Sequence, residues 1–277
     1  MATPATAPAR PVLEPGSPVV EFSHVSVTFD REPVLCDVSF TVRHGETRII
    51  LGPAGVGKSV IMKLANGLLT PDSGEIRIFG RLLSDLTARE MYELRAHIGM
   101  VFQESALFDS LDVEDNVAYR LNEEHVPEPQ AHDRVVEALR FVELEQAISK
   151  FPSELSGGMR RRVSIARAII SRPDLILYDS PTGGLDPITS TTIIQLIVKQ
   201  RDVSQTTSLL ITHRIQDAFM LATHRFDPSR NEMKLIPNNG IDPGTKFLVL
   251  NNGRIVFDGT TQELTRTTDP WLESFIS

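Results

Sequence analysis

Short apolar runs alternate with amphipathic stretches along most of the chain, which is the pattern of an α/β domain. Apolar runs of strand length occur at residues 47–51, 98–103, 175–179 and 207–212. Stretches with apolar positions at helical spacing occur at residues 60–68, 113–121, 133–144, 160–170 and 188–200. A sheet covered by helices is therefore the expected core.

The first part of the chain shows instead the period-two alternation of antiparallel strands. Residues 19–42 alternate in this way around a turn at 30–33, and residues 74–80 have the pattern of a further strand. Helical patterns dominate residues 104–170. We expect an N-terminal antiparallel β subdomain and a helical subdomain inserted at about 104–170.

Three segments fall outside this pattern. Residues 1–18 are rich in Ala, Pro and Thr and lack the apolar stretch of a secretory signal, so a disordered lead is expected before a domain at 19–264. Residues 227–246 are rich in Pro, Asn and Gly and are expected to form an extra surface loop or a short hairpin. Residues 265–277 form an amphipathic C-terminal tail.

Composition narrows the class of protein further. The chain has 277 residues, 41% of them apolar, and 36 acidic against 28 basic residues give a net charge of −8. This balance argues against nucleic-acid binding through broad electrostatic attraction. The single cysteine, Cys36, excludes an internal disulfide and favours a reducing compartment. No apolar run reaches the ~18–20 residues of a membrane span, so any membrane contact is expected to pass through a partner.

One stretch matches the phosphate-binding loop G-x-x-x-x-G-K-[ST] at every position, between a strand pattern and a helix pattern. In such a loop the backbone N–H groups and the helix dipole bind phosphate, the lysine reaches the β- and γ-phosphates, and the hydroxyl that follows binds Mg²⁺. The loop and the first residue after it are Gly52, Pro53, Ala54, Gly55, Val56, Gly57, Lys58, Ser59 and Val60.

Polar side chains stand where the other strand patterns end. Gln103, Asp179 and His213 each follow an apolar run, and ligands of open α/β sheets bind at the carboxyl ends of strands. Asp179 is suited to Mg²⁺. A lone histidine in this position is more often structural than catalytic. Phe29, at the end of an early strand, is either a base-stacking aromatic or an ordinary core residue.

A second candidate anion site lies before the basic helix at 160–170. Ser156 is a suitable helix N-cap, and Gly157 and Gly158 leave the first N–H groups of that helix uncovered.

Taken in order, these motifs resemble the ATP-binding subunit of an ABC transporter over about residues 19–264. The resemblance implies a P-loop domain with a RecA-like mixed sheet, ATP and Mg²⁺ as cofactors, and Phe29 as the aromatic that stacks on adenine. It implies that Ser59, Gln103 and Asp179 bind the metal ion and that His213 is the switch histidine. It also implies that Ser156, Gly157 and Gly158 contact the γ-phosphate on a facing subunit, and that Asp186 is the D-loop aspartate.

Two details are similar to a subgroup, the ATPases of the Mce-associated transporters that maintain lipid asymmetry. Met159 stands where most relatives carry glutamine, with arginines at 160–162, and the C-terminal tail is amphipathic. The resemblance implies a second ATPase subunit, a membrane permease and an Mce-domain protein as partners. It also implies a peripheral position on the inner face of the cytoplasmic membrane.

One departure concerns the reaction itself. Family members follow the strand aspartate with a glutamate that activates the attacking water, whereas Ser180 stands here. Loss of a general base costs ~10²–10⁴-fold in rate. Three interpretations remain open: slow hydrolysis, a substitute base such as Glu104 or His213, or pairing with a second ATPase that keeps its glutamate.

Three classes of function follow. The first is an ATP-driven subunit for lipid transport, with Ser180 in the catalytic position. The second is a regulatory nucleotide-binding subunit paired with an active ATPase. The third is a soluble ABC protein without a transport role, although those relatives carry a second ABC unit or a long coiled coil that this chain lacks.

Overall fold

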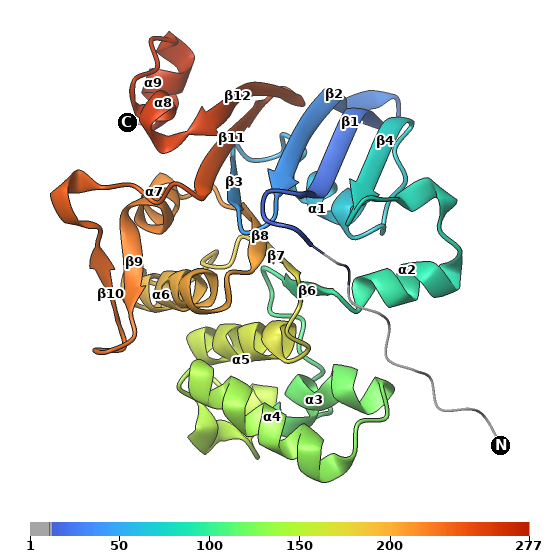
Figure 1. Ribbon diagram of the computed structural model, residues 1–277, viewed down its shortest axis with the longest axis vertical. Helices are drawn as coiled ribbons and strands as arrows, with labels where there is room; N and C mark the ends of the chain where they lie inside the picture. The colour runs from blue at the N-terminus through green and yellow to red at the C-terminus, as the bar shows by residue number, and fades with distance from the viewer. Residues whose placement is uncertain (1–10, 12, 277) are drawn as a thin grey trace.

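The computed structural model describes residue 11 and residues 13–276, arranged as two larger sheets and a two-stranded hairpin with helices packed around them (Figure 1). A four-stranded antiparallel sheet has the strand order β2-β1-β4-β5. Its strands are β1 (Pro18–Phe29), β2 (Glu32–Arg43), β4 (Ser73–Ile78) and β5 (Arg81–Leu82). Most of the expected disordered lead lies outside the described residues. Within the described part, Leu13 packs against the core and β1 already begins at Pro18.

The central sheet has six strands in the order β12-β11-β3-β8-β7-β6. All neighbours are parallel except the β11–β12 pair. Its strands are β3 (Thr47–Leu51), β6 (Ile98–Val101), β7 (Leu175–Asp179), β8 (Thr207–Ile211), β11 (Thr245–Asn251) and β12 (Arg254–Thr260). The mixed α/β core and the separate antiparallel sheet confirm the fold class expected from the sequence.

Helices fill the connections between these strands. The α-helices are α1 (Lys58–Ala65), α2 (Ala88–Arg95), α3 (Val113–Glu123), α4 (Glu128–Phe141), α5 (Gly157–Ile169), α6 (Pro187–Ser204), α7 (Ile215–Thr223), α8 (Thr261–Thr265) and α9 (Pro270–Ile276). Short 3₁₀ turns lie at Leu83–Asp85, Glu145–Ala147, Pro152–Glu154 and Pro237–Asn239. None of the helices in the described residues is long and apolar enough to cross a bilayer.

Alternation along the central strands divides the core between the two faces of the six-stranded sheet. Ile50 and Leu177 belong to the cluster that holds α1 and the antiparallel sheet. Their neighbours Ile49 and Tyr178 belong to the cluster that holds α3 to α7. Helices α1 and α5 therefore pack on opposite faces of this sheet.

The helical segment after β6 contains α3 and α4, which pack on α5 at the lower end of Figure 1. The polar, proline-bearing stretch at 122–130 predicts a loop between two helices, but helix α4 begins inside it, at Glu128. The prolines that suggested a loop lie at the start of this helix, where a missing N–H costs nothing. The boundary predicted at residue 133 was wrong for this reason.

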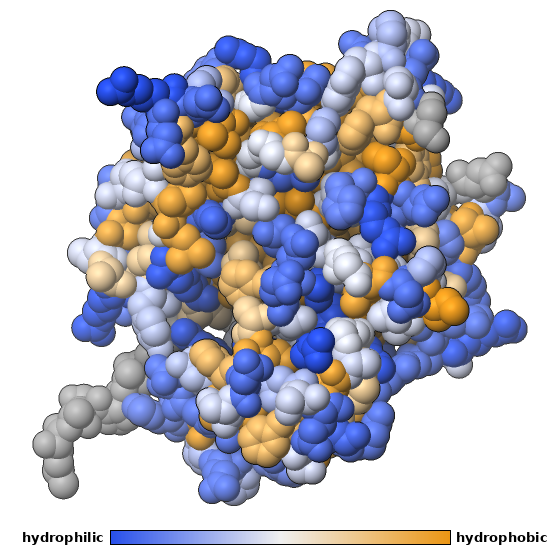
Figure 2. Space-filling view, turned by 180° about the vertical axis from the view of Figure 1, so that it is seen from behind, coloured by the Kyte–Doolittle hydropathy of each residue, from blue (hydrophilic) through white to orange (hydrophobic). Residues whose placement is uncertain are grey.

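Residues 224–235 form a two-stranded hairpin, β9 (His224–Asp227) and β10 (Glu232–Leu235), beside α6 (Figure 1). At the C-terminal end, Leu272 of α9 is buried and the rings of Trp271 and Phe275 stack at 5.2 Å. Across the rear face of the molecule, apolar side chains lie in patches between polar ones (Figure 2).

Candidate functional site

The loop between β3 and α1 is held in shape by its own lysine. The Lys58 ammonium donates hydrogen bonds to the carbonyl oxygens of Gly52 at 2.8 Å and Pro53 at 2.6 Å. Burial lowers the pKa of Lys58, and the Asp179 carboxylate opposes that change. The loop thus presents a cation close to the carboxylate at the end of β7.

Gly57 is required at the start of α1. Its φ is +98°, and a Cβ atom there would lie 2.8 Å from Leu35 Cδ2 and 2.9 Å from the carbonyl oxygen of Val34. By contrast, Gly55 has a φ of +78° and no atom within 4 Å of such a Cβ. A side chain at residue 57 would therefore push the loop away from strand β2.

The sheet register brings four strand ends to one edge. Ile50 of β3 pairs with Ile211 of β8, Ile211 pairs with Asp179 of β7, and Tyr178 pairs with Val101 of β6. These strands are parallel, so the segments that follow them leave from the same edge. The phosphate loop, His213, Ser180 and Gln103 follow β3, β8, β7 and β6 and therefore lie along that edge.

Ser180 has an unusual backbone at the end of β7. Its φ is +47°, in the left-handed region, and its side chain is nearly buried. The N–H of Ser180 donates to the carbonyl of Ile211 at 2.9 Å, and its hydroxyl lies 3.4 Å from Asp179 Oδ1. The Gln103 side chain lies nearby, about 3.5 Å from where a Cβ on Gly183 would stand.

Two sequence-identified residues of the site are exposed to solvent. Phe29, at the end of β1, has 44% of its surface exposed. His213 is also exposed, and its side chain makes no hydrogen bond to other described residues. Both side chains are free to meet a ligand.

Ser156 caps α5, accepting a hydrogen bond from the N–H of Met159 at 3.3 Å. Gly158 lies against the start of α6, where a Cβ would stand 2.4 Å from Thr189 Cγ2. That end of α6 is capped by Asp186, whose carboxylate accepts from the N–H groups of residues 188 and 189. Residues 156–158 therefore belong to the face that carries α5, opposite the face that carries α1.

The sequence did not indicate the part played by Arg161. Its guanidinium is buried and donates to carbonyl oxygens of Gln103, Ser180 and Pro181. The only sequence signal is the run of three arginines at 160–162, and the sequence does not indicate which of them is buried. In the structure Arg162 turns the other way, toward the carbonyls of residues 142 and 143.

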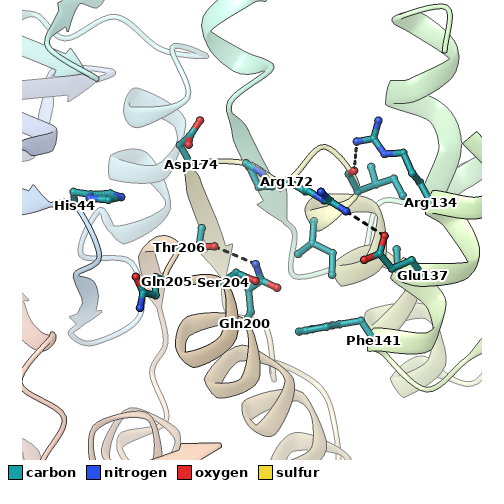
Figure 3. A pocket seen from close by; sticks show the side chains of 14 residues that line it. His44, Arg134, Glu137, Phe141, Arg172, Asp174, Gln200, Ser204, Gln205 and Thr206 are labelled. Atoms are coloured by element: carbon teal, nitrogen blue, oxygen red, sulfur yellow. Dashed lines mark hydrogen bonds and ion pairs between the residues drawn. The ribbon is translucent and has the colours of Figure 1, made fainter. Parts of the chain in front are cut away.

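A cavity of about 380 Å³ lies at the opposite edge of the sheet (Figure 3). Asp174 and Thr206, which line it, precede β7 and β8. Figure 3 shows the Gln200–Thr206 hydrogen bond and the ion pair of Arg172 with Glu137 along its wall. Because it opens at the amino ends of the strands, this cavity is separate from the candidate site.

Comparison with known proteins agrees with this geometry. Residues 35–183 match the family model described as "ABC transporter". The chain is 38% identical over 267 residues to the Arabidopsis thaliana protein TRIGALACTOSYLDIACYLGLYCEROL 3, chloroplastic, covering 93% of this chain and 73% of that protein. It is 33% identical over 259 residues to the intermembrane phospholipid transport system ATP-binding protein MlaF of Escherichia coli K12, covering 93% and 88%.

Among solved structures, the chain is similar to the ATP-binding cassette MJ0796 in a dimeric post-hydrolysis state bound to ADP and Pi. The TM-score is 0.73 at 28% identity, over 87% of this chain and 98% of the other. Family match, relatives and fold agree with the resemblance drawn from the motifs. The chain belongs to the ABC transporter family, and its fold is that of the family's ATP-binding domain.

Proposed function

We propose that this chain is the ATP-hydrolysing subunit of a membrane transporter that moves phospholipids or related lipids. The observation that carries the proposal is the edge at which β3, β8, β7 and β6 end together. It places a lysine-bearing phosphate loop beside Asp179 and beside three polar positions, Gln103, Ser180 and His213.

This edge fits the triphosphate of ATP with Mg²⁺. The phosphate would replace the Gly52 and Pro53 carbonyls as the partner of the Lys58 ammonium, while the backbone N–H groups of the loop surround it. Ser59, Asp179 and Gln103 would supply oxygen ligands of the kind that Mg²⁺ prefers. The exposed ring of Phe29 would stack on the adenine base.

A second subunit completes the site in this proposal. Ser156, Gly157 and Gly158 lie on the face opposite α1, so they do not close over the phosphate loop of their own chain. Two copies facing each other would bring the N-terminus of each α5 to the γ-phosphate held by the other copy, next to Asp186. In such an arrangement, bound ATP would contact both subunits and stabilise the dimer.

Hydrolysis in this chain depends on the position of Ser180. Its hydroxyl is held near the Asp179 carboxylate and is a poor base near neutral pH. Gln103 and His213 would orient the attacking water, and His213 or Glu104 would accept its proton. The side chains of His213 and Glu104 are exposed, and both residues adjoin the edge at which the strands end. Turnover is accordingly proposed to be slow, with ATP holding the closed pair for a long time.

A groove beside Gln103 supports a permease as partner. Its volume is about 310 Å³, and Phe102, Ala106, Phe108 and Tyr119 line it. Phe108 and Tyr119 are each 43% exposed. Three arginines, Arg95, Arg120 and Arg167, line the groove together with these apolar side chains. A largely apolar groove of this kind would accept a short helix, and its lining residue Phe102 directly precedes Gln103. The phospholipid cargo rests on the similarity to MlaF. An Mce-domain protein as a further partner rests only on the resemblance of Met159 and the C-terminal tail to the Mce-associated ATPases.

The test begins with the purified transporter, in which this chain is assembled with its permease. Phosphate release and transfer of a fluorescent phospholipid between liposomes are measured with wild type and with Lys58→Ala. ATP-dependent transfer that Lys58→Ala abolishes supports the proposal. Transfer that is equal with and without ATP, or unaffected by Lys58→Ala, contradicts it.

Ser180 favours a second candidate function, that of a regulatory subunit paired with a different ATPase. Mass spectrometry of the purified transporter separates the two. Two copies of this chain support a homodimer that hydrolyses ATP at sites formed by this chain alone. One copy beside a second ATPase supports the regulatory role.

A further inference from the structure

Arg161 ties together three segments that are distant in the sequence. The residue lies in the second turn of α5 and is 4% exposed. Its guanidinium donates to the Ser105 hydroxyl and the Gln103 carbonyl after β6, and to the Ser180 and Pro181 carbonyls after β7. The bonds to Ser180 and Pro181 measure 3.1 and 2.7 Å. One buried cation thus joins α5 to the segment after β6 and to the turn after β7.

Both backbone polar groups of Ser180 are hydrogen-bonded. The N–H donates to the carbonyl of Ile211 in β8, and the carbonyl accepts from Arg161 and from the N–H of Gly183. A residue in the left-handed region needs such support from its surroundings, because its backbone is strained. The direction of the side chain at position 180 therefore depends on Arg161 together with Ile211 and the turn to Gly183.

We propose that Arg161 is a positioning residue that couples the segment carrying Gln103 to the backbone of Ser180. A movement of the Gln103 segment, such as docking of a partner in the adjoining groove would cause, then shifts residue 180, beside which the attacking water would lie. The inference deepens the proposed function, on which its kinetic part rests. The structural claim, that Arg161 links the Gln103 segment to the Ser180 backbone, rests on the hydrogen bonds alone.

Only arginine suits this place. A guanidinium presents five N–H donors in a planar fork, so it can reach both segments at once, whereas an ammonium concentrates its donors at one point. The neighbouring arginines of α5 serve other contacts. Arg167 donates to the carbonyls of Ser105 and Ala106, and Arg162 to carbonyls within the helical segment.

Hydrogen–deuterium exchange and ATPase kinetics of the full-length protein test the proposal. Arg161→Met is expected to speed exchange at residues 103–107 and 180–185 together, while the rest of the central sheet stays protected. In the assembled transporter kcat should fall by about 10-fold, with KM for ATP within about twofold of wild type, because positioning and not nucleotide binding is lost.

Two further variants keep the test decisive. Arg161→Lys retains the buried charge and should fold even if Arg161→Met does not, and its exchange should lie between wild type and Arg161→Met. Arg162→Met, on the same helix, should speed exchange at residues 142–145 and leave kcat unchanged.

Faster exchange throughout the chain in Arg161→Lys, or in neither of the two segments, would overturn the coupling. A fall in kcat that is matched by Arg162→Met would also overturn it. If wild type hydrolyses ATP no faster than Lys58→Ala, hydrolysis by this chain is refuted, and the exchange data still decide the role of Arg161.

Discussion

Replacing Ser180 with glutamate should convert a slow ATPase into a faster one. A glutamate side chain extends about 2 Å further from the backbone than serine. From the position held by Ile211 and Arg161 it would reach past the Asp179 carboxylate toward the phosphate loop. The nearby negative charge of Asp179 should raise the pKa of the new carboxyl group and so strengthen it as a base near neutral pH.

The size of the effect follows from what a general base supplies. Such a base contributes ~10²–10⁴-fold to a rate, and part of that range is lost where a substitute such as His213 already acts. We therefore expect Ser180→Glu to raise kcat for phosphate release by at least ~10-fold. The left-handed φ of +47° is already present in wild type, so the backbone strain of a non-glycine residue there is not new.

The matched control is Ser180→Gln, which has the same length but no base. Steady-state phosphate release is measured for both variants in the assembled transporter across a range of pH. The glutamate variant should gain rate as pH rises through the pKa of its carboxyl group, and the glutamine variant should not. Equal rates for the two variants would refute the reasoning and show that another residue already supplies the base.

Three further substitutions test the fold around the site by chemical denaturation and nucleotide titration. Tyr178 is fully buried, and its hydroxyl has no hydrogen-bond partner among the described residues. Tyr178→Phe should therefore stabilise the protein by about 1 kcal/mol, against no change for the exposed Tyr119→Phe, and a loss of stability would show that the hydroxyl is satisfied. Gly57→Ala should weaken ATP binding at least ~10-fold more than Gly55→Ala, since only the former meets strand β2; equal losses would contradict this steric account. Thr182→Val should lower the free energy of unfolding by about 1–3 kcal/mol, because it removes the hydroxyl that donates to the buried Asp217 carboxylate. An unchanged denaturation midpoint would contradict this expectation.

Sequence patterns were sufficient for the parts of the fold in which local and tertiary preferences agree. The strand at 47–51, the loop and α1 follow each other as expected, because an apolar run, a glycine-rich turn and an amphipathic run each favour one structure. The start of α4 was missed since proline both breaks helices and begins them, and only the surrounding packing distinguishes the two uses.

The sequence predicted the motif residues of the candidate site, but not the residues whose hydrogen bonds hold them in place. Motif spacing identifies Lys58, Asp179 and Gln103, because each motif is local in the sequence. The contacts of Arg161 depend on where α5 crosses the ends of β6 and β7, which no local pattern encodes. The left-handed backbone of Ser180 was likewise not predictable from the local sequence, because its hydrogen-bond partners include Ile211 of β8 and Arg161 of α5.

The position of β3 has a consequence for how this protein is made. The strand that leads into the phosphate loop lies between β8 and β11, and β11 is among the last elements of the chain to be synthesised. While the polypeptide leaves the ribosome, the backbone N–H and C=O groups of Thr47–Leu51 that later pair with β11 have no partner strand. A nascent chain that stops before residue 245 should thus interact with chaperones and fail to retain ATP, although every motif of the loop has already been made.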